Sequence, residues 1–259
     1  VIAAAMGLSI NQTKSVVELQ FGDFVSPGFN PIVNYLAKVH YRWNQNADVV
    51  LRMPCGAGVG AGPFHSQTNE AWFTKTPGLK VVYPAFPSDA KGLLASAIND
   101  PNPVLFFEHK ALYRRIREEV PTDYFTLPLG KAKLLKSGTQ ISIITYGAGV
   151  HWALEFAKQQ PELAIDVLDL RSLCPLDEEA IFASVKKTGK VLLLQEDTIF
   201  GGIMSDISAL ISEHCFEHLD APIKRVGSLP TPVPFAAALE KQFLAKNKLE
   251  KTVMDLVAY

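Results

Sequence analysis

The sequence predicts an α/β fold with two domains built on mostly parallel sheets. Short apolar runs typical of buried strands alternate along the chain with stretches whose apolar residues recur at helical spacing. A charged, proline-bearing segment between Ala111 and Gly130 interrupts this alternation, which resumes after it. Repeats of strand, helix and strand favour parallel pairing, because a parallel connection needs a crossover of about a dozen residues or more. We therefore expect domains at 1–118 and 130–259, joined by a linker at 119–129.

The first half is expected to begin with a buried, small-residue helix at Val1–Ile10. Asn30, followed by Pro31, predicts a capped helix start, because asparagine suits the N-cap and proline the first turn. Ser88 predicts another capped start, ahead of the apolar residues that end with Ala97 and Ile98. The expected strands are Ser15–Phe21, Val49–Arg52, Leu79–Tyr83 and Val104–Glu108.

The second half repeats the alternation. Asp177 is the expected N-cap of a helix whose first turn carries Glu178 and Glu179, which suit the positive end of the helix dipole. The expected strands are Ile141–Thr145, Ile165–Leu168, Val191–Leu194 and Ile223–Val226. The expected helices are Val150–Gln159, Glu178–Lys187, Ile203–His214 and Phe235–Leu244.

Composition excludes several classes of protein. The 259 residues carry 25 Lys or Arg against 26 Asp or Glu, and 48% are hydrophobic, so global disorder is excluded. The near-neutral charge argues against nucleic-acid or membrane-surface binding as the main role. Cys55, Cys174 and Cys215 are far apart, which fits a reducing compartment, and no apolar run approaches the roughly 18 residues of a membrane span. The chain starts at Val1 within a predicted helix, so we expect it to be a piece of a longer protein.

Four glycines at alternate positions follow a predicted strand, at Gly56, Gly58, Gly60 and Gly62. A dinucleotide-binding loop would open directly into a helix that holds the phosphates, but here PFH follows without helical periodicity. We therefore expect the glycines to let the backbone approach a ligand or a neighbouring chain closely.

His65 comes directly after this loop, and histidine is the side chain most easily poised for proton transfer near neutral pH. A solvent-facing loop histidine is the simpler interpretation of the sequence alone.

Gln20, with Phe21 or Phe24, ends a predicted strand, where ligands of parallel sheets collect; a half-buried strand end is the alternative. His214 and His218 could bind a metal ion if they lay on one face of a helix. No third metal ligand is nearby in the sequence, so we expect both at the helix surface without a metal.

Several segments, in order along nearly the whole chain, resemble a known family. They are ELQFGDF (18–24), PFHSQ (63–67), PGLKVVYP (77–84), KGLLASAINDPNPVLFFEHKALYR (91–114) and VLDLRSLCPLD (167–177). Together they resemble the beta subunit of the decarboxylating component of 2-oxoacid dehydrogenase complexes, a thiamine-diphosphate family related to transketolase. The resemblance implies an N-terminally truncated pyrimidine-binding domain followed by a transketolase C-terminal-type domain.

The resemblance also implies a shared active site. An alpha subunit or fused alpha domain would hold the diphosphate and its Mg²⁺ through a GDG…N motif, and no GDG occurs in this chain. A second beta chain, and the lipoyl domain and core of a dihydrolipoyl acyltransferase, would be the further partners. The implied compartment is the bacterial cytoplasm, which we favour, or the mitochondrial matrix.

Site residues are carried over by position. Gln20 and Phe24 would line the cofactor, although branched-chain members have tyrosine in place of Phe24. His65 would be the active-site histidine that faces the substrate and the lipoyl group. The glutamate that activates the cofactor would fall about two residues before Val1 by motif spacing, and Glu18 does not replace it. A potassium site would use mainly backbone carbonyls, from Val49, Ala97, Ile98, Asp100 and Asn102.

The activity implied by the resemblance is oxidative decarboxylation of a 2-oxoacid with acyl transfer to lipoamide. ELQFGDF favours a branched-chain substrate such as 2-oxoisovalerate, and pyruvate is the alternative. A non-catalytic assembly or docking fragment of such a complex is a second hypothesis. A fragment of transketolase or deoxyxylulose-phosphate synthase is a third, against which the continuous match through 91–114 argues.

Overall fold

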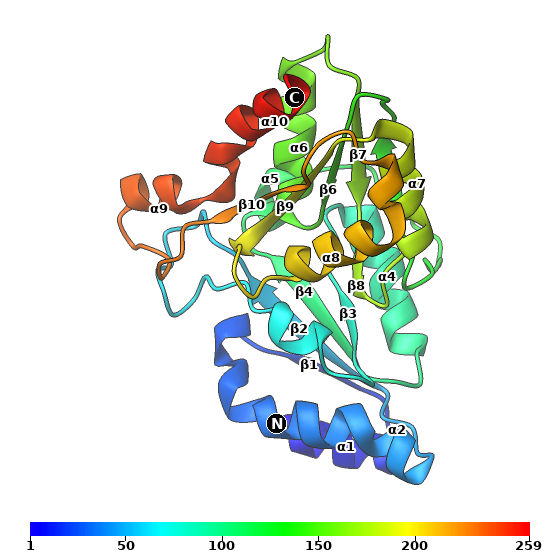
Figure 1. Cartoon of the computed structure of the whole chain (residues 1–259). Helices are drawn as coiled ribbons and strands as arrows, with labels where there is room; N and C mark the ends of the chain where they lie inside the picture. Colours follow the sequence, from blue (N-terminus) through cyan, green and yellow to red (C-terminus); the bar gives the residue numbers. More distant parts are fainter.

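Two five-stranded sheets organise the chain, as the computed structural model of residues 1–259 shows (Figure 1). The first sheet has the order β1-β2-β4-β3-β8. Its parallel strands are β1 (Ser15–Glu18), β2 (Val49–Cys55), β4 (Val104–His109) and β3 (Lys80–Val82). Every residue of β4 is buried, as expected of a central parallel strand covered on both faces.

The second sheet has the order β10-β9-β6-β7-β5. Its parallel strands are β10 (Lys224–Ser228), β9 (Val191–Thr198), β6 (Ile141–Thr145) and β7 (Ile165–Asp169). Each sheet also has one antiparallel edge strand. These are β5 (Lys133–Lys136), beside β7, and β8 (Ser172–Cys174), which leaves the second half to pair with β3.

Helices cover the sheets and one end of the molecule (Figure 1). In the first half they are α1 (Ile2–Ile10), α2 (Ala37–Trp43), α3 (Ala71–Thr74), α4 (Pro87–Asn99) and α5 (Leu112–Arg115), with a 3₁₀ segment at Gly22–Gly28 and a π-helical one at Pro31–Leu36. In the second half they are α6 (Ala148–Gln159), α7 (Glu178–Thr188), α8 (Ile203–Cys215), α9 (Ala237–Phe243) and α10 (Leu249–Val257), with 3₁₀ turns at Phe216–His218 and Ala245–Lys248. None of these helices has the length and apolar character needed to cross a bilayer.

One hydrophobic core joins the two sheets. It runs from Phe107 on β4 through Tyr83 to Tyr146, which follows β6, and continues to residues beneath α7 and α8. The ring of Tyr83 lies 5.7 Å from that of Phe107 and 5.4 Å from that of Tyr146. A separate core fills the other face of the second sheet, under α6 and α10. The two halves therefore pack as one body along the first of these cores.

Several local expectations are confirmed, and others are wrong in detail. Asp177 caps α7, since its carboxylate accepts a hydrogen bond from the backbone N–H of Ala180 at 3.4 Å. Ser88 does not cap a helix, whereas Asn30 stands at the predicted N-cap position with Pro31 in the first turn but forms no side-chain capping hydrogen bond. Helix α4 begins one residue before Ser88, at Pro87, because proline fixes a helical φ and holds the preceding Phe86 extended. Asn30 already has helical backbone angles, so its side chain cannot act as an N-cap.

The N-terminal helix is present but is not buried all round. Only Ile2, Ala5 and Ser9 of α1 are buried, because the rest of the chain packs against one face of the helix. The strand expected at Ser15–Phe21 ends at Glu18. Strands β5 and β8 and helix α10 were not predicted from the sequence.

The segment at 116–129 forms no helix or strand, yet it is held closely against α4. The ammonium group of Lys91 donates hydrogen bonds to the carbonyls of Thr122 at 3.1 Å and Asp123 at 2.9 Å. The N–H of Leu127 donates to the carbonyl of Gly92 at 3.1 Å. This connecting segment is therefore packed against α4 and is not a free linker.

Candidate functional site

The segments that follow β1 and β2 bring Phe21 and Phe24 against His65. These two strands are parallel neighbours, so the loops that follow them leave the same edge of the first sheet. The half-buried ring of His65 lies edge-on to Phe21, with centroids 4.7 Å apart, and to Phe24 at 5.5 Å. Phe24 is 45% exposed and Gln20 is also exposed. The cluster is therefore a partly open aromatic site at the molecular surface.

Lys110, the first residue after β4, fastens the loop that carries His65. Its ammonium group donates to the carbonyl of Gly56 at 3.0 Å and to that of His65 at 2.6 Å, which joins the two ends of the loop. It also lies 5.5 Å from the ring centroid of Phe21. Burial lowers the pKa of Lys110. Sequence reasoning did not select this lysine, although its place after a strand of the same sheet is the signal that could have identified it.

A backbone carbonyl selects the tautomer of His65. The Nδ1 atom lies 3.3 Å from the carbonyl oxygen of Ala61. A carbonyl can only accept a hydrogen bond, so the neutral ring carries its proton on Nδ1 and keeps an unprotonated Nε2. His65 can therefore accept a proton at Nε2 without first changing tautomer.

The glycine loop approaches the second half of the same chain. All four of its glycines have positive φ, from +69° at Gly62 to +89° at Gly56. Its N–H groups do not form an open phosphate cradle, because two buried carboxylates already accept from them. Glu196 Oε1 accepts from the N–H of Ala57 at 2.7 Å, and Glu240 accepts from the N–H groups of Gly58 and Gly60. These contacts are internal to the chain, and the expected close approach to a ligand or a neighbouring chain stays a prediction.

A buried polar cluster lies behind the loop, where the two halves meet. The hydroxyl of Tyr146 donates to Glu70 Oε1 at 2.6 Å, and His109 Nε2 lies 2.7 Å from Glu196 Oε2. Burial, followed by the nearby charge of Asp197, raises the pKa of Glu70 to about 8. Burial likewise raises the pKa of Asp197 to about 6. Glu70 is therefore mainly protonated at neutral pH, and sequence reasoning did not identify this cluster.

The residues expected to bind potassium lie at the opposite edge of the first sheet. Val49 begins β2, Ala97 and Ile98 end α4, and Asp100 and Asn102 form the turn before β4. The carboxylate of Asp100 pairs with Lys80 and accepts from the N–H of Asn102 at 2.9 Å. The carbonyl of Ile98 accepts from the ammonium group of Lys14 at 3.0 Å. Three of the five expected residues, Ile98, Asp100 and Asn102, thus already have polar partners within the chain.

The two helical histidines lie apart from these sites. His214 is on α8 with its ring 5.1 Å from that of Phe182, and His218 ends the following 3₁₀ turn. The structure contains no group of three or more His, Cys, Asp or Glu side chains placed to hold a metal ion.

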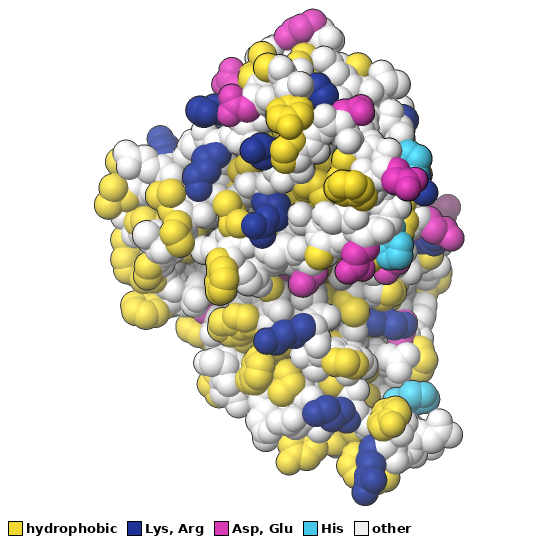
Figure 2. All heavy atoms as spheres, in the orientation of Figure 1, with side chains coloured by type: hydrophobic (Ala, Val, Ile, Leu, Met, Phe, Trp, Pro, Cys, Tyr) yellow, Lys and Arg dark blue, Asp and Glu magenta, His cyan; other side chains and the backbone are white.

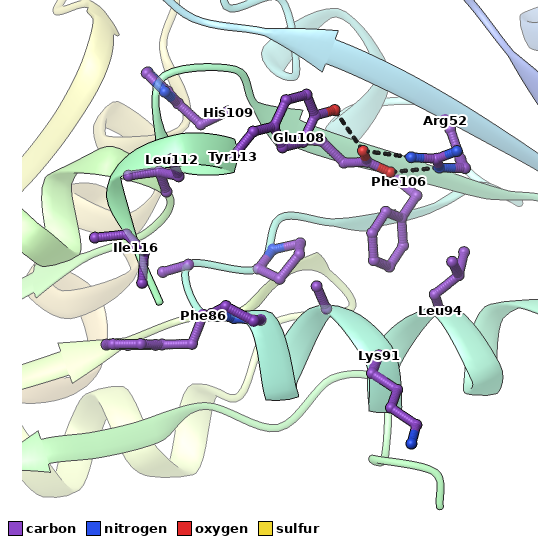
Figure 3. A pocket seen from close by; sticks show the side chains of 14 residues that line it. Arg52, Phe86, Lys91, Leu94, Phe106, Glu108, His109, Leu112, Tyr113 and Ile116 are labelled. Carbon is purple, nitrogen blue, oxygen red and sulfur yellow. Dashed lines mark hydrogen bonds and ion pairs between the residues drawn. The ribbon is translucent and has the colours of Figure 1, made fainter. Parts of the chain in front are cut away.

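A separate cavity of about 310 Å³ lies between β4, α4 and α5 (Figure 3). One wall is a hydrogen-bonded set: the guanidinium of Arg52 donates twice to the carboxylate of Glu108, which also accepts from the hydroxyl of Tyr113 at 2.5 Å. These groups satisfy one another, and the rest of the lining includes Phe86, Leu94, Phe106, Leu112 and Ile116. None of Gln20, Phe24 and His65 lines this cavity.

Comparison with known proteins gives the class of the fold. Residues 1–115 match the family described as the transketolase pyrimidine-binding domain, and residues 130–248 match the transketolase C-terminal domain. A solved structure described as a split gene transketolase, an inactive beta4 tetramer, superposes with a TM-score of 0.79. It has 23% sequence identity, and the match covers 99% of this chain and 80% of that one. The chain is thus a two-domain α/β protein of the transketolase type, as predicted.

Curated relatives define the family more narrowly. The 2-oxoisovalerate dehydrogenase subunit beta of Bacillus subtilis is 44% identical, over 100% of this chain and 81% of that protein. The acetoin:2,6-dichlorophenolindophenol oxidoreductase subunit beta of the same organism is 42% identical, over 99% and 76%. Its pyruvate dehydrogenase E1 component subunit beta is 40% identical, over 94% and 76%. The chain belongs to the transketolase-like family of 2-oxoacid dehydrogenase beta subunits.

Proposed function

We propose that this chain is the beta-type part of a thiamine-diphosphate-dependent 2-oxoacid dehydrogenase, which decarboxylates a branched-chain 2-oxoacid oxidatively and transfers the acyl group to lipoamide. The observation that carries the proposal is the position of His65. Its ring packs against Phe21 and Phe24 at the surface, in a chain 44% identical to a 2-oxoisovalerate dehydrogenase beta subunit. A general acid–base group at an open aromatic site suits chemistry on a bound cofactor and an incoming carrier.

The residues of this site fit thiamine diphosphate as half of a shared site. Gln20 offers both a hydrogen-bond donor and an acceptor, and Phe24 offers an exposed aromatic surface, so both could contact the pyrimidine part. When bound, the cofactor supplies the carbanion chemistry of decarboxylation. The glycine loop is not available to the diphosphate, because Glu196 and Glu240 occupy its N–H groups. This supports a partner that holds the diphosphate and Mg²⁺.

His65 would handle protons during acyl transfer. Ala61 keeps its proton on Nδ1, so Nε2 is free to accept a proton from a thiol and to return one to the reacting group. Phe21 and Phe24 limit rotation of the ring, and Lys110 holds the backbone that carries it.

Replacement of His65 by alanine tests this role in the assembled enzyme. We expect lipoamide acylation to fall by roughly 10²- to 10⁴-fold, while the unfolding temperature stays close to that of the unmodified protein. The exposed His40 on α2 provides the matched control, and His40→Ala should leave acylation unchanged. Near-normal acyl transfer by a folded His65→Ala variant would contradict the role.

The branched-chain substrate is supported by the relatives' names, among which 2-oxoisovalerate dehydrogenase subunits stand beside pyruvate and acetoin enzymes. Comparison of kcat/KM for 2-oxoisovalerate and pyruvate in the reconstituted complex tests it. A higher value for pyruvate would make the chain a pyruvate dehydrogenase beta subunit.

We extend the proposal to the assembly. The partners would be an alpha subunit or domain, a second beta chain, and the lipoyl domain and core of an acyltransferase. Figure 2 shows hydrophobic side chains on the surface over α9 and over the end that holds α1 and α2. Large exposed side chains there include Tyr41, Trp43 and Phe235, and such surfaces mark contacts between chains. If thiamine diphosphate fails to bind both with and without an alpha chain, the chain would be an assembly fragment.

The remaining expectations stay proposals. The domain ranges 1–118 and 130–259 with a linker at 119–129 are supported by family matches at 1–115 and 130–248. A cytoplasmic location is supported by bacterial relatives, and the mitochondrial alternative by a relative from Dictyostelium discoideum. Expression of a tagged chain in its own cells would decide between these compartments.

A potassium site at the turn after α4 is supported by the position of Ala97, Ile98, Asp100 and Asn102 at the end of this helix and in the turn that follows it, since backbone carbonyls are suitable ligands for a cation. Of the five expected residues, Ile98 already shares its carbonyl with Lys14. Equal unfolding temperatures in potassium and choline chloride would argue against the site.

A further inference from the structure

Glu240 reaches from α9 into the glycine loop of the first half. Its Oε1 accepts from the N–H of Gly58 at 2.8 Å, and both of its oxygens accept from the N–H of Gly60, at 3.2 and 3.1 Å. The residue is only 5% exposed. In Figure 1, α9 and the segment before it lie beside the loop that follows β2. The contact therefore joins positions 180 residues apart in the sequence.

The carboxylate and the loop depend on each other. A buried carboxylate is costly unless donors compensate its charge, and backbone N–H groups that converge on an anion provide such donors. A glycine-rich loop has little conformational preference of its own, so its shape depends on the contacts that hold it. Charge-assisted hydrogen bonds to Glu240 are strong enough to select one shape.

The loop leads directly to the histidine. Gly60, which Glu240 holds, precedes Ala61, whose carbonyl accepts from Nδ1 of His65. Lys110 holds the carbonyls of Gly56 and His65 at the two ends of the loop. Glu196 holds the N–H of Ala57 and Arg115 the carbonyl of Gly58, so Gly60 is held by Glu240. Phe21 and Phe24 contact the ring and leave the position of the Ala61 carbonyl undetermined.

We infer that Glu240 is a positioning residue: by holding the N–H groups of Gly58 and Gly60, it places the Ala61 carbonyl that fixes the Nδ1–H tautomer of His65. The consequence for catalysis rests on the proposed function, in which His65 acts at Nε2. The consequence for the tautomer does not, because it concerns only atoms of this chain.

Three variants test the inference in the complete protein. Glu240→Ala removes both acceptors, Glu240→Gln keeps the Oε1 acceptor, and Glu250→Ala removes an exposed glutamate of α10 as the matched control. Nitrogen-15 NMR of the His65 ring reports the tautomer, and amide hydrogen exchange reports the hydrogen bonds of Gly58 and Gly60. We expect Glu240→Ala to give a mixture of tautomers and at least about tenfold faster exchange at both amides. Glu240→Gln and Glu250→Ala should keep the original signals.

Kinetics of the assembled enzyme give a second measurement. We expect Glu240→Ala to lower kcat for acyl transfer roughly 10- to 100-fold, with the KM for the 2-oxoacid little changed and activity restored in Glu240→Gln. If the unmodified complex shows no 2-oxoacid turnover, the proposed function fails, while the NMR result still decides the positioning role.

A folded Glu240→Ala protein with unchanged His65 signals and unchanged exchange at Gly58 and Gly60 would overturn the inference. If Glu240→Ala does not fold, Glu240→Asp keeps the charge but is one methylene too short to reach the loop. The same change in tautomer and exchange is then expected from Glu240→Asp, and unchanged signals would again overturn the inference.

Discussion

Glu70 offers a test of the polar cluster between the two halves. Its side chain is 1% exposed, and Oε1 accepts from the hydroxyl of Tyr146 while Oε2 is buried without a partner. Glu70→Gln preserves the shape and the carbonyl acceptor but removes the titration. We expect the variant to change how the free energy of unfolding depends on pH.

The sign and size follow from the two pKa values. The pKa of Glu70 is about 8 in the folded protein and close to 4.5 when the chain is unfolded. Between these values the folded state keeps a proton that the unfolded state releases, so stability falls as pH rises, by about 1.4 kcal/mol per pH unit. The contribution is fully present below about pH 4.5 and is lost as the pH passes through about 8. Summed over that interval, the loss is on the order of 5 kcal/mol.

Urea unfolding at about pH 5.5 and about pH 7.5 measures the effect. Glu70→Gln should lose less stability between the two pH values than the unmodified protein, by roughly 2–3 kcal/mol. Glu217→Gln, at an exposed position, should follow the unmodified protein. Parallel pH dependences for Glu70→Gln and the unmodified protein would refute the reasoning, because they would show that Glu70 titrates alike in both states.

Two further predictions concern backbone and thiols. Gly147→Ala should destabilise the protein by roughly 2–4 kcal/mol, because Gly147 has φ of +55° and an added Cβ would lie 2.8 Å from the ring of Tyr83. Thermal unfolding measures this effect. Gly7→Ala is the control, because a Cβ at Gly7 would meet no neighbour and should stabilise α1 by about 0.5–1 kcal/mol. A Gly147→Ala protein as stable as the unmodified one would contradict the clash with Tyr83. A thiol reagent should label the half-buried Cys174 before Cys55, because burial raises the pKa of the Cys55 thiol well above its usual value. Peptide mass spectrometry measures the order of labelling, and earlier labelling of Cys55 would contradict its burial.

The fold could be predicted where local pattern and pairing agree. Runs such as Val104–Phe107 are apolar throughout because both faces of a parallel strand are covered, so they stand out in the sequence. The short edge strands β5 and β8 have no such apolar run, because each is a strand only through its pairing with a neighbouring strand. Ser88 failed as a cap because the adjacent proline had the stronger local preference.

The site was predictable only in part. The strand-end rule selected Gln20 and Phe24, and the structure brings Phe24 next to His65, although the roles of all three residues stay predictions. Glu196 and Glu240 escaped prediction because they act over long sequence separations, and no local periodicity encodes such contacts. The four glycines predicted that another group would lie close to this loop, but the sequence did not indicate which group.

Strand β8 has a consequence for biosynthesis. The edge of β3 is covered only by residues Ser172–Cys174, which are synthesised after the whole connection and the first strands of the second sheet. An uncovered strand edge is a template for association with other chains. During translation the β3 edge of the first sheet therefore stays uncovered until residues Ser172–Cys174 of the second half emerge. The first sheet is therefore completed only after part of the second half has been synthesised.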